Sequence, residues 1–360
     1  MSNKRKIVGK PLTALFCASA AASILLTQLG EGVSTQSLEE FARDKDIPMQ
    51  VFEDLPHKDH TRVYRDNIAG FYYDVGHNTW TTADLLSKQI VSNDERIYLR
   101  ATVKVGSSVL IYPATLAMQL LGNLVAGDLN AYAIPGVSSA DTCYINPPGD
   151  MTLVSFIHQF TDIPEEHLSD ITDEVAPIVP IMAHEAEHCN LVLGETFKER
   201  GLKSFTTGGE SNADNHYMKM HKSIYPQSNM DKIFFYTRAV SLFSRENIFD
   251  GGHATSLNVD AFLNGVEMPS REQAYYNYGH LNELIKKELL DFESDDDGAY
   301  YQAAYQAVQK LLRESDELTP FMRRAAEIYL EGVEYLADKS PLFTTSATPH
   351  KAQVLQGPLV

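Results

Sequence analysis

The chain has 360 residues, of which 44% are hydrophobic and 22% are charged, and its formal net charge is -18 at pH 7. This composition is typical of a soluble enzyme, and the length allows one large domain or two smaller ones. The acidic balance argues against a nucleic-acid partner, because a protein that binds phosphate groups needs a basic surface.

The first 30 residues have the pattern of a targeting segment. A basic cluster that includes Lys4, Arg5 and Lys6 precedes an uncharged apolar stretch over 11–29. This order is typical of a secretory signal peptide, and about 19 apolar residues are also just long enough to cross a bilayer. We therefore expect residues 1–30 to be a signal peptide or a membrane anchor. The protein is then exported, as a periplasmic or secreted protein, or is held at the membrane by residues 11–29.

The next hundred residues contain weaker patterns. Residues 31–66 are polar and interrupted by prolines, which predicts a linker or an irregular segment. The stretch 96–112 is rich in β-branched residues on both sides of Gly106, which predicts a hairpin. The apolar residues of 113–127 and 151–160 predict two helices.

Residues 184–188 form the most informative motif, His-Glu-Ala-Glu-His. Four residues advance an α-helix by about 400° and about 6 Å, so His184 and His188 lie on one face and can bind the same metal ion. Apolar residues precede and follow the motif, which predicts a buried helix. Glu185 is placed to take a proton from a zinc-bound water, whose pKa the metal lowers to about 7. The motif therefore predicts a Zn²⁺ hydrolase.

A catalytic zinc ion of this kind takes three protein ligands, so a third must come from elsewhere in the chain. Glu210 is the best candidate, because the 22 positions after His188 allow a second helix to pack beside the first. Asp214 follows Glu210 by four residues and can form a hydrogen bond to a ligand histidine from the same helix face. His216 is the rival third ligand.

The remainder of the chain has helical periodicity. Apolar residues at spacings of three and four predict helices over 231–245, 271–292, 299–313 and 319–337. The end of the chain, 341–360, is rich in Thr, Ser, Pro and Gln and is expected to be disordered. We expect a catalytic core over 67–225, continued in the same domain by a helical part over 226–340.

Three stretches together resemble the gluzincin zinc metallopeptidases, and within them the group of the HtpX heat-shock protease and the prenyl-protein processing proteases. They are Ala183-His-Glu-Ala-Glu-His188, Glu210-Ser-Asn-Ala-Asp214 and Asn130-Ala-Tyr-Ala-Ile-Pro-Gly136. The last is similar to an Asn-Ala-Phe-Ala-x-Pro-Gly-Gly strand of that group. The resemblance implies an α+β fold that is mostly α-helical, with a zincin-like domain, a small β-sheet and an active-site helix.

The resemblance also implies roles for particular residues. In that group the third ligand lies in a Glu-x-x-Ala-Asp element, which corresponds to Glu210 here. The strand forms the edge of the substrate cleft, so Asn130, Ala131, Tyr132 and Ala133 are expected to bind a polypeptide that adds as another strand. The chain departs from the group because no pair of membrane helices is predicted beside the site.

The expected activity is that of a zinc metalloendopeptidase. Two alternatives share the zinc residues: an inactive metal-binding homologue that acts as an interaction module, and a zinc amidase for a non-protein amide such as that of a cell wall. The group that stabilises the oxyanion stays open among Tyr217, His221, Tyr225, His253 and His280.

Cys143 and Cys189 are the cysteines left outside the targeting segment. In an exported protein they could pair and tie the zinc helix to the chain after the predicted strand, but two cysteines are also the ordinary yield of chance. Their pairing stays open at this point.

Overall fold

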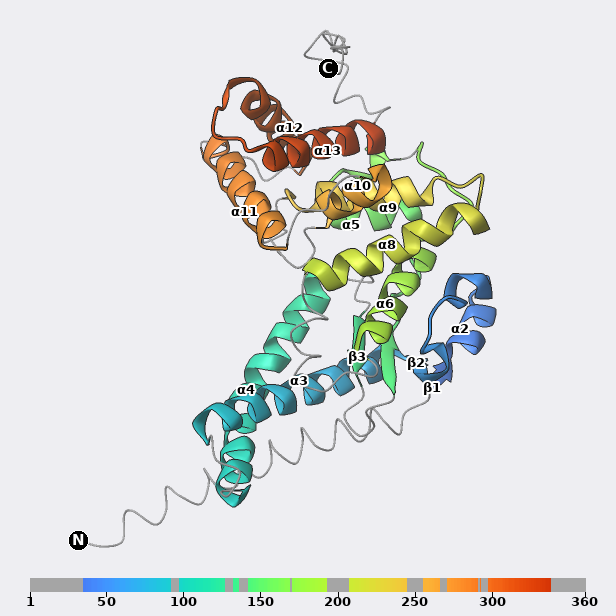
Figure 1. Ribbon diagram of the computed structural model, residues 1–360, viewed down its shortest axis with the longest axis vertical. Helices are drawn as coiled ribbons and strands as arrows, with labels where there is room; N and C mark the ends of the chain where they lie inside the picture. Colours follow the sequence, from blue (N-terminus) through green and yellow to red (C-terminus); the bar gives the residue numbers. More distant parts are fainter. Residues whose placement is uncertain are drawn as a thin grey trace, which may run out of the picture.

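The computed structural model describes residues 35–91, 97–126, 132–135, 142–168, 170–192, 207–244, 255–265, 271–290, 292 and 297–337. The expected signal peptide or anchor at 1–30 and the expected tail at 341–360 lie outside these residues, as do Asn130, Ala131 and His253. Within them the chain is mostly helical with one small sheet, as expected (Figure 1).

The part of the sheet that lies within the described residues has four strands in the order β1-β2-β4-β3. These are β1 (Thr35–Ser37), β2 (Thr61–Tyr64), β3 (Tyr132–Pro135) and β4 (Cys143–Asn146). β2 and β4 are parallel, whereas the two outer pairs are antiparallel. Val63 and Ile145 are fully buried at the centre of the sheet. β3 is an edge strand, which agrees with its expected position.

The linker prediction for 31–66 is wrong for the part that the structure describes. This part contains β1, β2, helix α2 (Leu38–Asp44) and two short 3-10 helices, η1 (Met49–Phe52) and η2 (Lys58–His60). The polar residues that suggested a linker have structural roles, because Ser37 and Glu40 form a reciprocal capping box at the start of α2. Phe41 and Phe52 are buried in the core.

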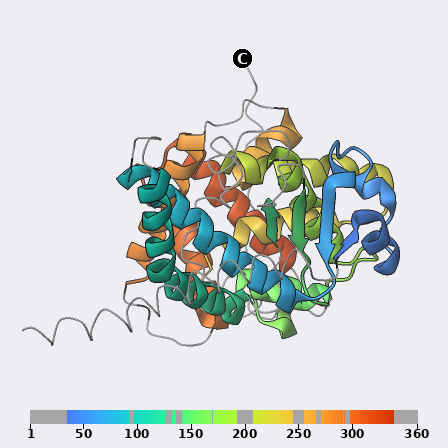
Figure 2. The same cartoon turned by 90° about the horizontal axis from the view of Figure 1, so that it is seen from below.

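The hairpin prediction for 96–112 is also wrong. Residues 97–112, the part of this stretch that the structure describes, belong to α4 (Ile97–Ala126), which runs antiparallel to α3 (Asn67–Ile90). Asp84 of α3 binds Lys104 of α4 at 3.1 Å, and Gln119 of α4 bonds to Asp74 of α3, so the two helices pack along their length. This tertiary packing decides over the local β-propensity. α4 lies at the edge of the molecule, with α3 between it and the sheet (Figures 1 and 2).

The helix predicted over 113–127 is the second half of α4, so its expected beginning at Pro113 is wrong. The remaining predicted helices are confirmed within a few residues of the ends that were expected for them, and α10 is an addition. They are α5 (Leu153–Thr161), α6 (Ile178–Val192), α8 (Thr207–Ile224), α9 (Met230–Ser241), α10 (Ser256–Asn264), α11 (Arg271–Glu288), α12 (Asp297–Glu314) and α13 (Pro320–Leu336), with a 3-10 turn η5 (Glu165–His167). α13 packs on α9, and α8 packs across α6 (Figure 1). The sheet lies on the other side of α6, so α6 is held between the sheet and α8.

A disulfide joins Cys143 of β4 to Cys189 of α6, with the two Cα atoms 5.6 Å apart. Both cysteines are fully buried. Cys189 follows His188 directly, so the bond fixes the end of the histidine motif to the sheet. This pairing resolves the question that the sequence left open.

Candidate metal centre

Helix α6 carries the histidine motif through the interior of the molecule. Met182, Ala183, Ala186 and Cys189 give the helix small or apolar buried contacts on several sides. His184 and His188 are therefore buried as well, as the apolar flanks of the motif predict. A buried imidazole needs a polar partner, because an unsatisfied polar group in the interior costs about 1–3 kcal/mol. The partners come from α8.

Glu210, in the first turn of α8, reaches both histidines. Its Oε2 lies 3.0 Å from His184 Nε2, and its Oε1 lies 3.3 Å from His188 Nε2. The two Nε2 atoms are 3.0 Å apart. Ligand atoms around a tetrahedral zinc ion with bonds of about 2.0–2.2 Å are separated by about 3.3–3.6 Å, which is within a few tenths of an ångström of these distances. The three buried side chains therefore have the spacing of a shared site and could hold a metal ion.

Asp214, one turn after Glu210, orients His184. Its Oδ1 accepts from His184 Nδ1 at 2.8 Å, so His184 Nε2 faces the other two ligand atoms. Thr255 Oγ1 donates to Asp214 Oδ2 at 2.6 Å and fixes the carboxylate. A carboxylate behind a ligand histidine is a common device in metal sites, because it sets the tautomer and increases the basicity of the ring.

The charges in this cluster are strongly coupled. Burial opposes protonation of His184, but Asp214 and Glu210 outweigh burial and raise the pKa of His184 to about 10. Burial acts to raise the pKa of Asp214, but Arg238, His184 and Thr255 together hold it below its usual range. The metal-free site therefore favours a proton at the position where a cation would bind.

Glu185 lies on α6 beside His184 and is nearly buried, with 9% of its surface exposed. Glu187, the second acidic residue of the motif, has a different environment. Its Oε2 accepts from Asn190 Nδ2 at 3.0 Å and lies 3.9 Å from His216 Nδ1. His216 is therefore placed beside Glu187, and the group that could hold a metal ion contains Glu210 and not His216.

Two residues that contact the site were not predicted. Arg238 of α9 places Nη2 at 3.4 Å from His184 Nε2 and at 3.7 Å from Asp214 Oδ1. The sequence indicates Arg238 only indirectly, as one cation among the apolar residues Phe234, Phe235, Ala239 and Val240. A positive charge in such surroundings requires a nearby negative charge. Thr255, at the start of α10, has no comparable signal.

Four of the residues that the sequence offers for oxyanion stabilisation, Tyr217, His221, Tyr225 and His280, lie within the described part of the chain. Each contacts side chains outside the group around His184. Tyr217 Oη lies 2.8 Å from His221 Nδ1, and His221 Nε2 lies 3.1 Å from Ser228 Oγ, in a buried chain of hydrogen bonds. Tyr225 packs against the ring of His221, and His280 stacks on Tyr276. The structure does not bring these side chains into the group around His184.

Of the four residues expected to bind substrate, Tyr132 and Ala133 are in β3. This strand lies next to α6, and Ala133 pairs with Ile145 of β4. Because β3 is an edge strand of the described sheet, its outer side is where a further strand could add.

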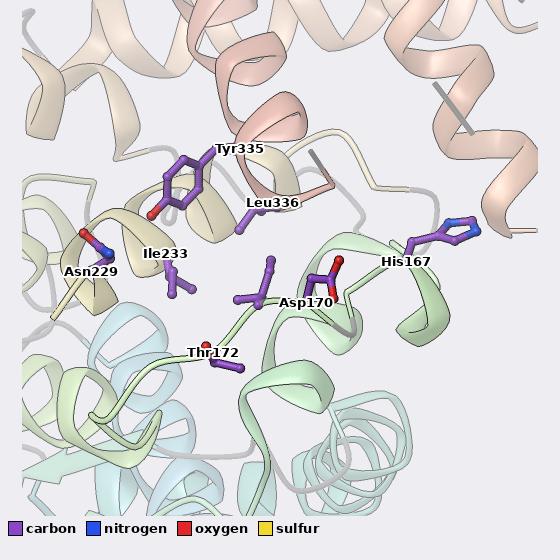
Figure 3. Close-up of a pocket in the computed structure, with 8 residues that line it drawn as sticks. His167, Asp170, Thr172, Asn229, Ile233, Tyr335 and Leu336 are labelled. Atoms are coloured by element: carbon purple, nitrogen blue, oxygen red, sulfur yellow. The ribbon is translucent and has the colours of Figure 1, made fainter. Parts of the chain in front are cut away.

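A separate cavity of about 200 Å³ lies between α9, α13 and the segment around 170–172 (Figure 3). Tyr335 and Asn229 line one side, and Asp170 and Thr172 line the other. None of the residues that line it belongs to the metal-binding group. The cavity is therefore distinct from the candidate metal centre.

The chain matches no protein-family model, no curated protein and no solved structure. The chemistry assigned to the site therefore depends on its residues and their geometry.

Proposed function

We propose that the protein is a zinc-dependent metalloendopeptidase of the gluzincin type, with a zincin-like catalytic core. The observation that carries this proposal is the buried triangle of His184, His188 and Glu210, which are contributed by two packed helices. Two imidazole nitrogens and one carboxylate are the donor set of several catalytic zinc sites, which keep the fourth position for water or substrate.

The residues of the chain have distinct roles in this mechanism. Zn²⁺, when bound by the three ligands, supplies a Lewis acid and lowers the pKa of a bound water. Glu185 takes the proton of the attacking water and delivers it to the leaving amine. Asp214 holds His184 in the orientation that presents Nε2.

Arg238 is the cation that we assign to stabilise the oxyanion. Its guanidinium lies 3.4 Å from a ligand atom, so it is adjacent to the position where negative charge develops on the scissile carbonyl. The polypeptide substrate is proposed to add to β3 as a further strand, with Tyr132 and Ala133 in contact with it. Backbone hydrogen bonds would then hold the substrate and require little sequence preference.

Export of the protein is part of the same proposal. The buried disulfide between Cys143 and Cys189 supports an oxidising compartment, where such bonds persist. The basic and apolar pattern of residues 1–30 supports a signal peptide or an anchor at the beginning of the chain.

The test compares cleavage of casein by the full chain and by Glu185→Gln, each with its zinc content measured. Gln keeps the shape of the side chain but cannot accept the proton of the water, so cleavage should fall by at least about 100-fold while zinc stays bound. Glu187→Gln is the matched control, because it makes the same change two residues away on a side chain that faces Asn190. This control should cleave casein at the wild-type rate.

Equal cleavage by the wild type and Glu185→Gln would discard the peptidase assignment. Zinc binding without cleavage of casein or of a cell-wall amide would favour the inactive interaction module. Cleavage of the cell-wall amide alone would favour the amidase.

A further inference from the structure

Helix α4 has an inverted distribution of polar and apolar side chains. In a soluble protein the apolar side chains of a helix face the core and the polar ones face water. On α4, Leu110 is 75% exposed and Met118 is 73% exposed. Pro113, Ala114 and Ala117 are exposed with them. These five residues follow the spacing i, i+3, i+4, i+7, i+8, so they form one continuous apolar face, which we call the outer face of α4.

Three polar side chains of the same helix face α3 or bond within the helix. Gln119 forms a hydrogen bond with the buried carboxylate of Asp74 in α3. Ser108 Oγ donates to the carbonyl of Val105, and Thr115 Oγ1 donates to the carbonyl of Ile111. In apolar surroundings, hydroxyl groups bond to the backbone of their own helix and polar side chains face a neighbouring helix. α4 therefore has the polarity expected of a helix whose solvent is hydrocarbon.

The length and the position of α4 agree with a hydrocarbon surrounding. The segment Leu99–Leu120 is long and apolar enough to cross a membrane, and at about 1.5 Å per residue it is about 33 Å long, against about 30 Å for the hydrocarbon of a bilayer. Only 11% of the most apolar part of this segment is buried inside the protein, whereas the core helix of a soluble protein is mostly buried. Its internal position separates it from the targeting segment at 11–29.

The charged residues of α4, Arg100 and Lys104, lie near the beginning of the helix, where they face Asp84 of α3. Asp84 binds Lys88 at 2.6 Å and Lys104 at 3.1 Å, and Lys104 also lies over the ring of Trp80. After Lys104 the sequence of α4 contains no charged residue. Paired charges and a tryptophan suit the headgroup region of a bilayer, beyond which the uncharged part of the helix can contact acyl chains.

We propose that the outer face of α4 is a lipid-binding surface that contacts the acyl chains of a bilayer. A second copy of the chain fits this face less well. Stable protein interfaces bury about 800 Å² per partner and use aromatic or arginine anchors, whereas three of the five outer-face residues are Pro or Ala. The net charge of -18 favours zwitterionic over anionic lipid. This surface is independent of the proposed peptidase activity, so Glu185→Gln should bind vesicles as the wild type does.

The test uses the tryptophan fluorescence of the full chain. The chain has one tryptophan, Trp80, so Trp80→Phe gives a silent background to which Leu110→Trp is added. The matched control adds Leu263→Trp instead, at an exposed leucine of α10 that is 51% accessible. Both proteins are mixed with phosphatidylcholine vesicles whose acyl chains carry bromine, which quenches tryptophan only at contact. Both proteins contain the apolar stretch at 11–29, so binding through that stretch cannot cause a difference in quenching between them.

The expected result is a loss of fluorescence of roughly twofold or more for Leu110→Trp and none for Leu263→Trp, because only the outer face of α4 enters the acyl region. Adding Met118→Glu to Leu110→Trp should abolish the quenching, because a charge on this face is costly in hydrocarbon. Circular dichroism checks that each variant is folded.

Two results would overturn the proposal. One is the absence of quenching at position 110, or equal quenching at positions 110 and 263, in folded proteins. The other is a dimer in sedimentation equilibrium without lipid that Leu110→Glu dissociates, which would assign the outer face to a second copy of the chain.

Discussion

Asp214→Asn should weaken zinc binding while every metal ligand stays in place. The substitution preserves the size of the side chain and removes its charge. In the wild type, His184 Nδ1 donates to Asp214 at 2.8 Å in a fully buried position, so the carboxylate increases the basicity of the ring that binds the metal. The asparagine oxygen can still accept this hydrogen bond, but the uncharged amide stabilises a metal-bound imidazole less well.

The expected loss is about 10–100-fold in zinc affinity, which corresponds to about 1.4–2.7 kcal/mol. The contacts of Asp214 favour the upper half of this range, because the carboxylate also accepts from Thr255 at 2.6 Å and lies 3.7 Å from Arg238. The loss should be smaller than that for removal of a ligand.

The assay is a competition titration between the protein and a chromogenic zinc chelator. Asp231→Asn is the control, because this carboxylate is also buried but binds Lys222 at 3.1 Å on the far part of α8. An affinity for Asp214→Asn within twofold of that of the wild type, or an equal loss in Asp231→Asn, would refute the assigned role.

Three further outcomes are expected. Zinc binding near pH 7.5 should release about one proton from His184, because its pKa of about 10 in the metal-free protein lies above this pH; calorimetry in buffers of different ionisation enthalpy measures the release. Arg238→Met should lower the cleavage rate by about 100–1,000-fold, measured with casein at equal zinc content. Replacing Cys143 and Cys189 together by Ala should lower the free energy of unfolding by up to about 4 kcal/mol, because the bond closes a loop with a separation of 46; urea titration measures the loss.

Each of these outcomes has a contradicting result. Zinc binding with no proton release would show that His184 is neutral before the metal arrives. Arg238→Met with the wild-type rate would remove Arg238 from the mechanism, and a parallel loss of zinc would reduce it to a support for the ligands. An unchanged urea midpoint in the cysteine variant would show that the bond does not constrain the unfolded chain.

The helix that carries the site could be predicted because its information is local. The spacing of His184 and His188 places them on one face of any helix, and the apolar flanks predict that this face is buried. Glu210 and Asp214 could be predicted from their own spacing of four residues. The contact between the two helices still had to be assumed, because no local pattern encodes it.

Arg238 and Thr255 could not be placed from the sequence. They lie 54 and 71 positions after His184, and they reach Asp214 only through the packing of α9 and the start of α10 on α8. Long-range packing also explains the wrong hairpin over 96–112, because the partner that keeps these residues helical is α3. The linker prediction fails over residues 35–64 because these helices and strands are short and have one polar face. Each therefore contributes too few apolar residues to form a recognisable pattern in the sequence.

The zinc content of the full chain tests the account most directly, when Glu210→Ala and His216→Ala are compared with the wild type after reconstitution and removal of free metal. The account predicts one zinc ion per chain in the wild type and in His216→Ala, and almost none in Glu210→Ala. Zinc retained by Glu210→Ala and lost from His216→Ala would contradict the proposed ligand set, and a wild type without zinc would contradict the metal centre itself.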